Sequence, residues 1–271
     1  MGAGPERFVH NGVEQTLRNC GYDVYVDCIE ARGSFRAEIK TAFELYATLA
    51  ERVGLAYRSG TFPLVLSGNC SSCLGTVAGV DPVQLGIIWF DSHGDFNTPE
   101  TTESGFLDGM GLATAAGLCW EKMAASIPNF KPVWGRNILH VGGRDFYPEE
   151  QALFEQSGGS IIPASVIRKT SMREALELCL KDLGTRVSRI YLHFDLDVLD
   201  PTIAPANEFA VADGLSLAQV QEAIQMIGKQ FTICASGIAS YDPQFDEKDK
   251  ILTSGIEIMK STLATVMSQR A

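Results

Sequence analysis

The feature that most constrains the fold is a run of four apolar residues, Ile87, Ile88, Trp89 and Phe90, that leads directly into the sequence D-S-H-G-D. The run is too short for a helix and is rich in β-branched and aromatic side chains, which is typical of a buried strand. In open α/β sheets, ligands bind in the crevice beyond the carboxyl ends of the strands. The pattern therefore predicts a functional site where this strand ends.

Three side chains that commonly bind metals, Asp91, His93 and Asp95, follow this strand. Carboxylates crowded beside a hydrophobic strand repel one another, so they require protons or a cation. A second apolar strand has the same design, because it is followed by Asp195 and Asp197. Two such strand ends favour a shared metal site over two unrelated polar loops.

Apolar runs alternate with segments of helical periodicity along the whole chain. The expected strands are 22–28, 62–66, 87–90, 137–141, 160–162, 190–194 and 232–239. The expected helices are 8–19, 35–57 with Ser34 as its cap, one ending at 77, 109–120, 172–183, 216–230 and 251–267. This alternation predicts an α/β fold with three layers, α/β/α, around a mostly parallel central sheet, and residues 1–271 as a single domain.

The composition excludes several classes of partner. A net charge of −11 argues against nucleic acid and against anionic membrane surfaces. No apolar run approaches the length of a membrane span and the N-terminus has no signal-peptide character, so we expect a cytoplasmic protein. Seven cysteines, an odd number scattered along the chain, indicate reduced thiols rather than a disulfide framework.

Four motifs, taken in order, resemble those of the arginase/agmatinase ureohydrolase family. They are W-F-D-S-H-G-D-F-N-T-P at 89–99, S-G-F-L-D-G-M at 104–110, F-D-L-D-V-L-D-P at 194–201 and Y-D-P at 241–243. The resemblance covers about residues 62–255. It implies a metal-dependent hydrolase that cleaves a linear C–N bond in a guanidino, amidine, ureido or amide substrate with a metal-activated hydroxide. It also implies a binuclear manganese site, a small-molecule substrate and a homo-oligomer, either a trimer or a hexamer.

The resemblance gives a role to each matching residue. Asp91 and Asp195 would bridge the two metal ions, and Asp95 would bind the first ion and also handle a proton. His93 and Asp197 would bind the second ion. The polar loop that contacts substrate in the family is matched by Asn97, Thr102 and Ser104.

Four positions depart from the family pattern. Cys70 replaces the histidine that binds the first metal, and Asp108 replaces a histidine that shuttles protons or contacts substrate. Ser240 replaces the glutamate that holds the guanidinium group, and Tyr147 replaces an aspartate used for the α-amino group of arginine. Without the glutamate we expect a neutral amide, ureido or amidine-like substrate, or a weakly held cation, and not arginine itself.

Several interpretations stay open at this stage. Cys70 is either a metal ligand, which would favour Zn²⁺ or Fe²⁺ over Mn²⁺, or a small buried thiol. Asp108 is either catalytic or the N-cap of the helix expected at 109–120. His193 is a substitute ligand, a partner of the ligands or a core histidine, and the core interpretation is favoured.

Two alternatives to a two-ion hydrolase are kept. Asp91, His93 and a later aspartate form the ligand set of a mononuclear, deacylase-like zinc hydrolase. The substitutions would also fit a catalytically lapsed homologue that binds metal or regulates a partner. An enzyme is favoured, because buried ligands are costly to retain without a function.

Overall fold

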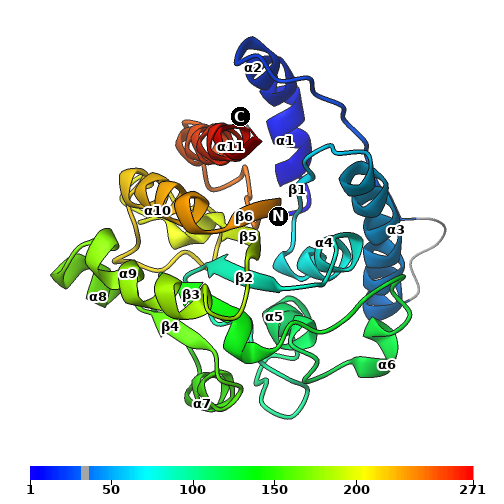
Figure 1. Ribbon diagram of the computed structural model, residues 1–271, viewed down its shortest axis with the longest axis vertical. Coiled ribbons are helices and arrows are strands. Elements are labelled where there is room, and N and C mark those ends of the chain that lie inside the picture. Colours follow the sequence, from blue (N-terminus) through cyan, green and yellow to red (C-terminus); the bar gives the residue numbers. More distant parts are fainter. Residues whose placement is uncertain (32–36, 271) are drawn as a thin grey trace.

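The computed structural model describes residues 1–31 and 37–270. One sheet of six parallel strands runs through the centre of the molecule in the order β1-β6-β5-β2-β3-β4 (Figure 1). The strands are β1 Leu64–Leu66, β2 Leu85–Phe90, β3 Ile138–Val141, β4 Ser160–Ile162, β5 Arg189–Asp195 and β6 Thr232–Ala239. The predicted parallel sheet is confirmed.

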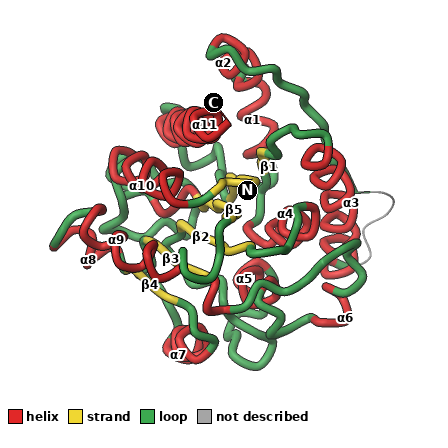
Figure 2. Tube along the Cα trace, in the orientation of Figure 1, coloured by secondary structure: helices red, strands yellow, loops and turns green. Residues whose placement is uncertain are grey.

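Helices cover both faces of the sheet, which gives the three layers seen in Figures 1 and 2. On one face lie α3 Glu38–Arg58, α4 Cys73–Gly79, α5 Gly111–Ala115 and α6 Glu121–Ala124. On the other lie α1 Gly4–His10, α2 Val13–Asn19, α8 Ala164–Lys169, α9 Met172–Leu183, α10 Leu217–Gln230 and α11 Lys250–Arg270. Helix α7 Pro148–Gln156 lies near the β4 edge. No helix within the described residues is both long and apolar enough to cross a membrane.

Each face of the sheet has its own hydrophobic core. Along β2, Ile88 and Phe90 belong to the core under α8 to α11, whereas Ile87 and Trp89 belong to the core under α3 to α5. This alternation follows from the two-residue period of a strand. Burial on both faces explains why β2 is apolar throughout, as strands of parallel sheets are.

Some expected elements differ from the structure. Residues 22–28 form no strand, because no neighbouring strand pairs with them, and Tyr25 is 78% exposed. The helix expected at 8–19 is two helices, since Gly12 between them has a φ of 74°. The helix expected at 109–120 ends at Ala115, just before Gly117 with a φ of 79°. Ser34, the expected cap of the helix at 35–57, lies outside the described residues.

Candidate metal centre

The register of the two central strands brings the predicted ligands together. Phe90 pairs with Phe194 in the β2–β5 ladder, so Asp91 and Asp195 come abreast at the carboxyl end of the sheet. Both side chains are almost fully buried. Two aspartates 104 residues apart in the chain thus meet because parallel strands end at the same edge.

A first ligand group consists of Asp91, His93 and Asp197, whose donor atoms lie within 4.8 Å of one another. His93 Nδ1 lies 3.3 Å from Asp197 Oδ2 and 3.6 Å from Asp91 Oδ1. Asp197 comes from the 3-10 helix η4 Leu196–Val198, which follows β5 directly. The side chain of His93 keeps 28% of its surface exposed, so the group is open to solvent at this imidazole.

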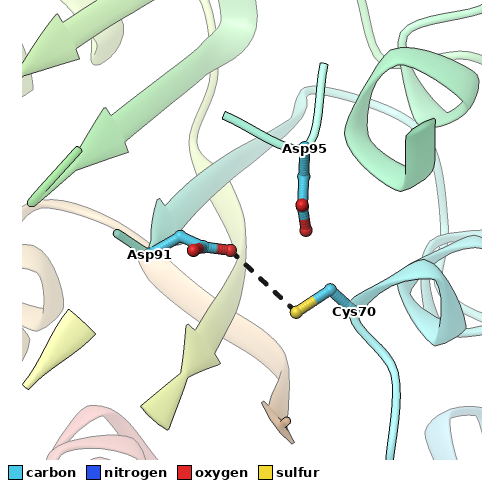
Figure 3. A group of neighbouring side chains, drawn as sticks. All are labelled: Cys70, Asp91 and Asp95. Carbon is cyan, nitrogen blue, oxygen red and sulfur yellow. Dashed lines mark hydrogen bonds between the residues drawn. The ribbon is translucent and has the colours of Figure 1, made fainter. Parts of the chain in front are cut away.

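A second ligand group shares Asp91 and adds Cys70 and Asp95 (Figure 3). Figure 3 shows the three side chains directed toward one another, with Cys70 Sγ 4.0 Å from Asp91 Oδ2. The same thiol donates to Asp195 Oδ2 at 3.0 Å. Asp91 therefore belongs to both groups, as the resemblance implied for a bridging ligand.

Asp108 fixes the segment that carries Cys70. Its Oδ2 accepts from the backbone N–H of Cys70 at 3.1 Å, and its Oδ1 accepts from that of Ser71 at 2.7 Å. These N–H groups open the 3-10 helix η1 Cys70–Ser72, which continues into α4. Of the two open interpretations of Asp108, the N-cap of the helix expected at 109–120 is wrong, because α5 begins at Gly111 without a side-chain cap and the Asp108 carboxylate accepts from Cys70 and Ser71 instead.

Three residues that the sequence analysis overlooked hold the first group in place. Ser92 Oγ donates to Asp197 Oδ1 at 2.7 Å and lies 2.9 Å from His93 Nδ1. Asn207 Nδ2 donates to Asp197 Oδ2 at 3.2 Å. Arg144 donates to the carbonyl of Asp197 at 2.7 Å. Ser92 lies inside the recognised motif and Arg144 lies three residues after the end of the expected strand at 137–141, but the sequence carries no local signal for Asn207.

Charge is unevenly distributed over the two groups. Burial opposes protonation of His93, but Asp197 and Asp91 outweigh it and raise the pKa of the imidazole to about 12. Burial likewise opposes ionisation of Asp197, but His93 outweighs it and lowers the pKa of this carboxyl to about 2. Asp197, which is buried, and His93, which is partly exposed, thus form an ion pair.

The remaining carboxyl groups have too little positive charge around them. Burial and repulsion from Asp197 raise the pKa of Asp91 to about 6. Burial, with repulsion from neighbouring aspartates, raises the pKa of Asp95 and of Asp195 well above the ordinary value. Four buried carboxylates with one imidazolium fit a divalent cation, which would replace the protons that these groups otherwise retain.

Ser240 completes the buried cluster. It follows β6, whose Ala239 pairs with Asp195, and its Oγ lies 3.3 Å from Cys70 Sγ. Ser240 and Asp95 have left-handed φ values of 61° and 50°. Such values are uncommon for residues other than glycine and concentrate at functional sites, where the surrounding structure enforces them.

His193 is a core residue, as favoured from the sequence. Its ring stacks on Trp89 with centroids 3.6 Å apart, and its Nδ1 lies 2.8 Å from the hydroxyl of Tyr191. Burial lowers the pKa of this imidazole to about 3, which keeps the ring neutral. Trp89 in turn donates from Nε1 to Asp91 Oδ2 at 3.0 Å. The stacked rings of His193 and Trp89 therefore help to hold the candidate ligand Asp91 in place.

The candidate substrate-binding loop bonds mainly to itself. Asn97 is buried, and its Oδ1 accepts from Thr101. Thr102 Oγ1 accepts from the N–H of Gly105, and Ser104 Oγ accepts from that of Phe106. These contacts fix the shape of the loop, and direct contact of Asn97, Thr102 and Ser104 with substrate stays a prediction.

The parallel α/β fold with acidic ligands and one histidine at its strand ends is typical of a metal-dependent hydrolase. A sequence profile described as the Arginase family matches residues 3–265. The arginase of Bacillus caldovelox is 29% identical over 273 residues, which cover 95% of this chain and 90% of that protein. The arginase of Bacillus subtilis (strain 168) is 32% identical over 220 residues, which cover 79% and 73%. A crystal structure of Bacillus subtilis arginase superimposes with a TM-score of 0.89 at 28% identity, covering 96% of this chain and 91% of that one.

The chain belongs to the arginase family. It is therefore an enzyme of the arginase-like type, a metal-dependent ureohydrolase that acts on C–N bonds. The resemblance found from the motifs alone is confirmed.

Proposed function

We propose that this enzyme hydrolyses a guanidino, amidine, ureido or amide compound other than arginine. The observation that carries the proposal is the position of Ser240, whose neutral hydroxyl lies within the buried ligand cluster, 3.3 Å from Cys70 Sγ. The resemblance gives this position to a glutamate that holds a cationic guanidinium. A hydroxyl supplies hydrogen bonds but no charge, so it favours a neutral or weakly held group.

The proposed ligand set contains six residues of this chain. Cys70, Asp91 and Asp95 would hold one ion, Asp91, His93 and Asp197 a second, and Asp195 would bridge the two. A bound divalent cation lowers the pKa of water and polarises the substrate. In the reaction the oxygen of water bonds to the substrate carbon, the C–N bond breaks, and the nitrogen leaves with a proton. Asp95 would carry that proton, and Asp108 would act on catalysis by positioning Cys70.

Manganese is the metal expected from the family, and Cys70 extends the choice to zinc or iron. Thiolates favour these softer ions, whereas carboxylates suit Mn²⁺. A second candidate function is that of a mononuclear zinc hydrolase. It is supported by the group of Asp91, His93 and Asp197, which supplies the three protein ligands that such a site needs. Metal analysis separates the two, since close to two ions per chain contradicts the mononuclear site and close to one contradicts the binuclear site.

The test of the function is a substrate screen. The purified chain is loaded separately with Mn²⁺, Zn²⁺ and Fe²⁺ and assayed with arginine, agmatine and a set of guanidino, amidine, ureido and amide compounds. We expect turnover of at least one compound with kcat/KM about a hundredfold above that for arginine, a difference of about 2.7 kcal/mol. Asp95→Asn should abolish that turnover. Arginine as the best substrate would overturn the proposal.

Three further properties stay predictions. We propose a single domain, a cytoplasmic location and a trimer or hexamer of identical chains. Limited proteolysis, cell fractionation and light scattering of the purified protein would test them in that order.

A further inference from the structure

Exposed aromatic side chains gather beside the open side of the candidate metal centre. The ring of Phe209 meets the His93 ring edge-on, with centroids 6.5 Å apart and planes at 88°. The ring of Phe106 lies 6.0 Å from that of Phe209. Phe106 is 41% exposed and Phe209 is 44% exposed, so the pair offers apolar surface next to the solvent-accessible ligand.

Both rings are presented by backbone that is tied down. The N–H of Phe209 donates to Asn207 Oδ1, and the other end of the Asn207 amide donates to Asp197. Two residues further on, the carbonyl of Val211 accepts from Arg144 at 2.8 Å. Phe209 is thus attached to the residues that hold the first ligand group, and its place follows from theirs.

Phe106 comes from a different loop, the one that also carries Ser104 and Asp108. Its N–H donates to Ser104 Oγ, and Asp108, two residues further on, holds the segment of Cys70. Phe209 is therefore fixed relative to the group of His93, and Phe106 is fixed relative to the group of Cys70. The contact between Phe106 and Phe209 therefore joins two separate loops, and Phe209 carries it to His93.

A third aromatic residue lies near the same edge. Asp145 Oδ2 is 3.8 Å from His93 Nε2, and Tyr147, two residues later, is 42% exposed. Tyr147 also occupies the position where the resemblance implies an aspartate for the α-amino group. At this one position the chain thus carries a phenol ring in place of a carboxylate that would pair with an α-amino group, two residues after Asp145, whose carboxylate is exposed.

We infer that Phe106 and Phe209 form a specificity pocket for an aromatic or bulky apolar group attached to the C–N unit of the substrate. This inference rests on the proposed function and names the substrate class more closely. Aromatic pairs prefer offset or edge-to-face contacts at 4.5–7 Å, and both rings retain enough exposed surface for a third ring to pack against them. The side chain of a free amino acid substrate would bury no comparable apolar surface against them.

The test compares matched compounds that share one reactive group. Benzyl and methyl derivatives of guanidine and of urea are assayed for kcat/KM with the metal-loaded enzyme, and their binding is measured by calorimetry. We expect the benzyl compounds to bind at least about tenfold more tightly than the methyl compounds. Phe209→Ser and Phe106→Ser should each reduce that ratio several-fold, through KM rather than kcat, and Phe209→Leu should retain most of it.

Trp134→Ser provides the matched control. Trp134 is 61% exposed and precedes the amino end of β3, at the edge of the sheet opposite the ligands. Its loss should leave the benzyl-to-methyl ratio unchanged. Thermal unfolding of each variant checks that the chain remains folded.

The outcomes separate the inference from the proposed function. Equal binding of benzyl and methyl compounds that are nevertheless hydrolysed would overturn the pocket and retain the function. A benzyl preference that survives in both phenylalanine variants would also overturn the pocket. Benzyl binding that depends on Phe209, without hydrolysis of any compound, would support the pocket and overturn the proposed function.

Discussion

The two ligand groups at the sheet edge differ in how their charge is balanced. In the group of Asp91, His93 and Asp197, an imidazolium faces two carboxylates, and serine and amide donors complete the arrangement. In the group of Cys70, Asp91 and Asp95, two carboxyl groups face a neutral thiol, and no cationic side chain belongs to the group. The charge of the first group is therefore balanced by the proton on His93, which an ion bound there would displace, whereas the second group would depend on an ion for neutralisation.

This difference indicates which of the candidate ligands can be substituted with the least disturbance of its neighbours. A ligand whose orientation is fixed by neighbours, such as His93, cannot change without disturbing Ser92 and Asp197. Cys70 is held through its backbone by Asp108 and also through its thiol, which contacts Asp195 and Ser240. The departure from the family pattern falls at this candidate ligand, whose backbone contact to Asp108 does not depend on the side chain.

The largest effect is expected from the residue common to both groups. Asp91→Asn should lower kcat/KM by about 10³-fold or more, because it weakens both ions and their polarisation of substrate. The measurement is kcat/KM together with metal content by mass spectrometry. If the Asp91→Asn variant retained one full equivalent of metal per chain and most of the activity, Asp91 would not be a ligand shared by two ions.

An exchange at the second group should change metal preference. Cys70→His should raise the affinity for Mn²⁺ relative to that for Zn²⁺, because a thiolate is a softer ligand than an imidazole. We expect a change of about tenfold to a hundredfold in this affinity ratio, the size of effect that contacts around a metal site commonly have on metal affinity. Competitive titration with both metals measures this ratio. Cys73→Ser is the control, since the Cys73 thiol donates to the carbonyl of Gly111 and lies outside both groups. An equal shift in the two variants would show that Cys70 is not a ligand.

A smaller effect is expected behind the first group. Ser92→Ala removes the hydroxyl that donates to Asp197 and should weaken the ion held there by about tenfold, the lower end of what such supporting contacts contribute. The readout is the midpoint of metal release under a chelator. The ion of the second group should be released at an unchanged midpoint, and equal weakening of both would contradict the separation of the groups.

The smallest effect concerns the stability of the metal-free protein. The pKa of Asp91 is raised from 3.8 in the unfolded chain to about 6 in the folded protein. The protonated carboxyl therefore stabilises the folded state at low pH, and this contribution is lost as the pH rises through 6. His93, with a pKa raised from 6.5 to about 12, contributes stability that is lost above pH 6.5. Asp197, with a pKa of about 2, contributes stability above 3.8 that does not change between pH 5 and 8.

Above pH 6.5 the neutral core imidazole of His193, whose lowered pKa makes stability rise with pH only up to that point, no longer contributes to the change of stability with pH. Calorimetry of the chelated protein should therefore show a Tm that falls by several degrees between about pH 7 and 9, as the contribution of His93 is lost. With metal bound, the ion competes with protons for the same ligands, and the trend should reverse. Parallel curves with and without metal would contradict the fit of these carboxylates to a cation.

The fold could be predicted well where apolar runs were long. The strands at 87–90, 190–194 and 232–239 and the helices at 172–183 and 216–230 occur within a few residues of expectation, since burial on a fixed face imposes a strong period. The strand expected at 22–28 was wrong, because an apolar pattern becomes a strand only where a neighbour supplies backbone hydrogen bonds. The helix expected at 109–120 was too long, because the apolar pattern continues past Gly117 although this glycine adopts a left-handed φ that ends the helix.

The site could be predicted only as far as its motifs reach. The sequence by itself determined the family and predicted the candidate ligands, because short spacing after a buried strand brings Asp91, His93 and Asp95 to one edge of the sheet. Only the tertiary structure decided that Asp108 holds the Cys70 segment, that Asn207 supports Asp197, and that Phe106 and Phe209 meet beside His93. The physical reason is that these contacts join segments separated by ten to more than a hundred residues, and no local period or propensity records which segments the packed sheet brings together.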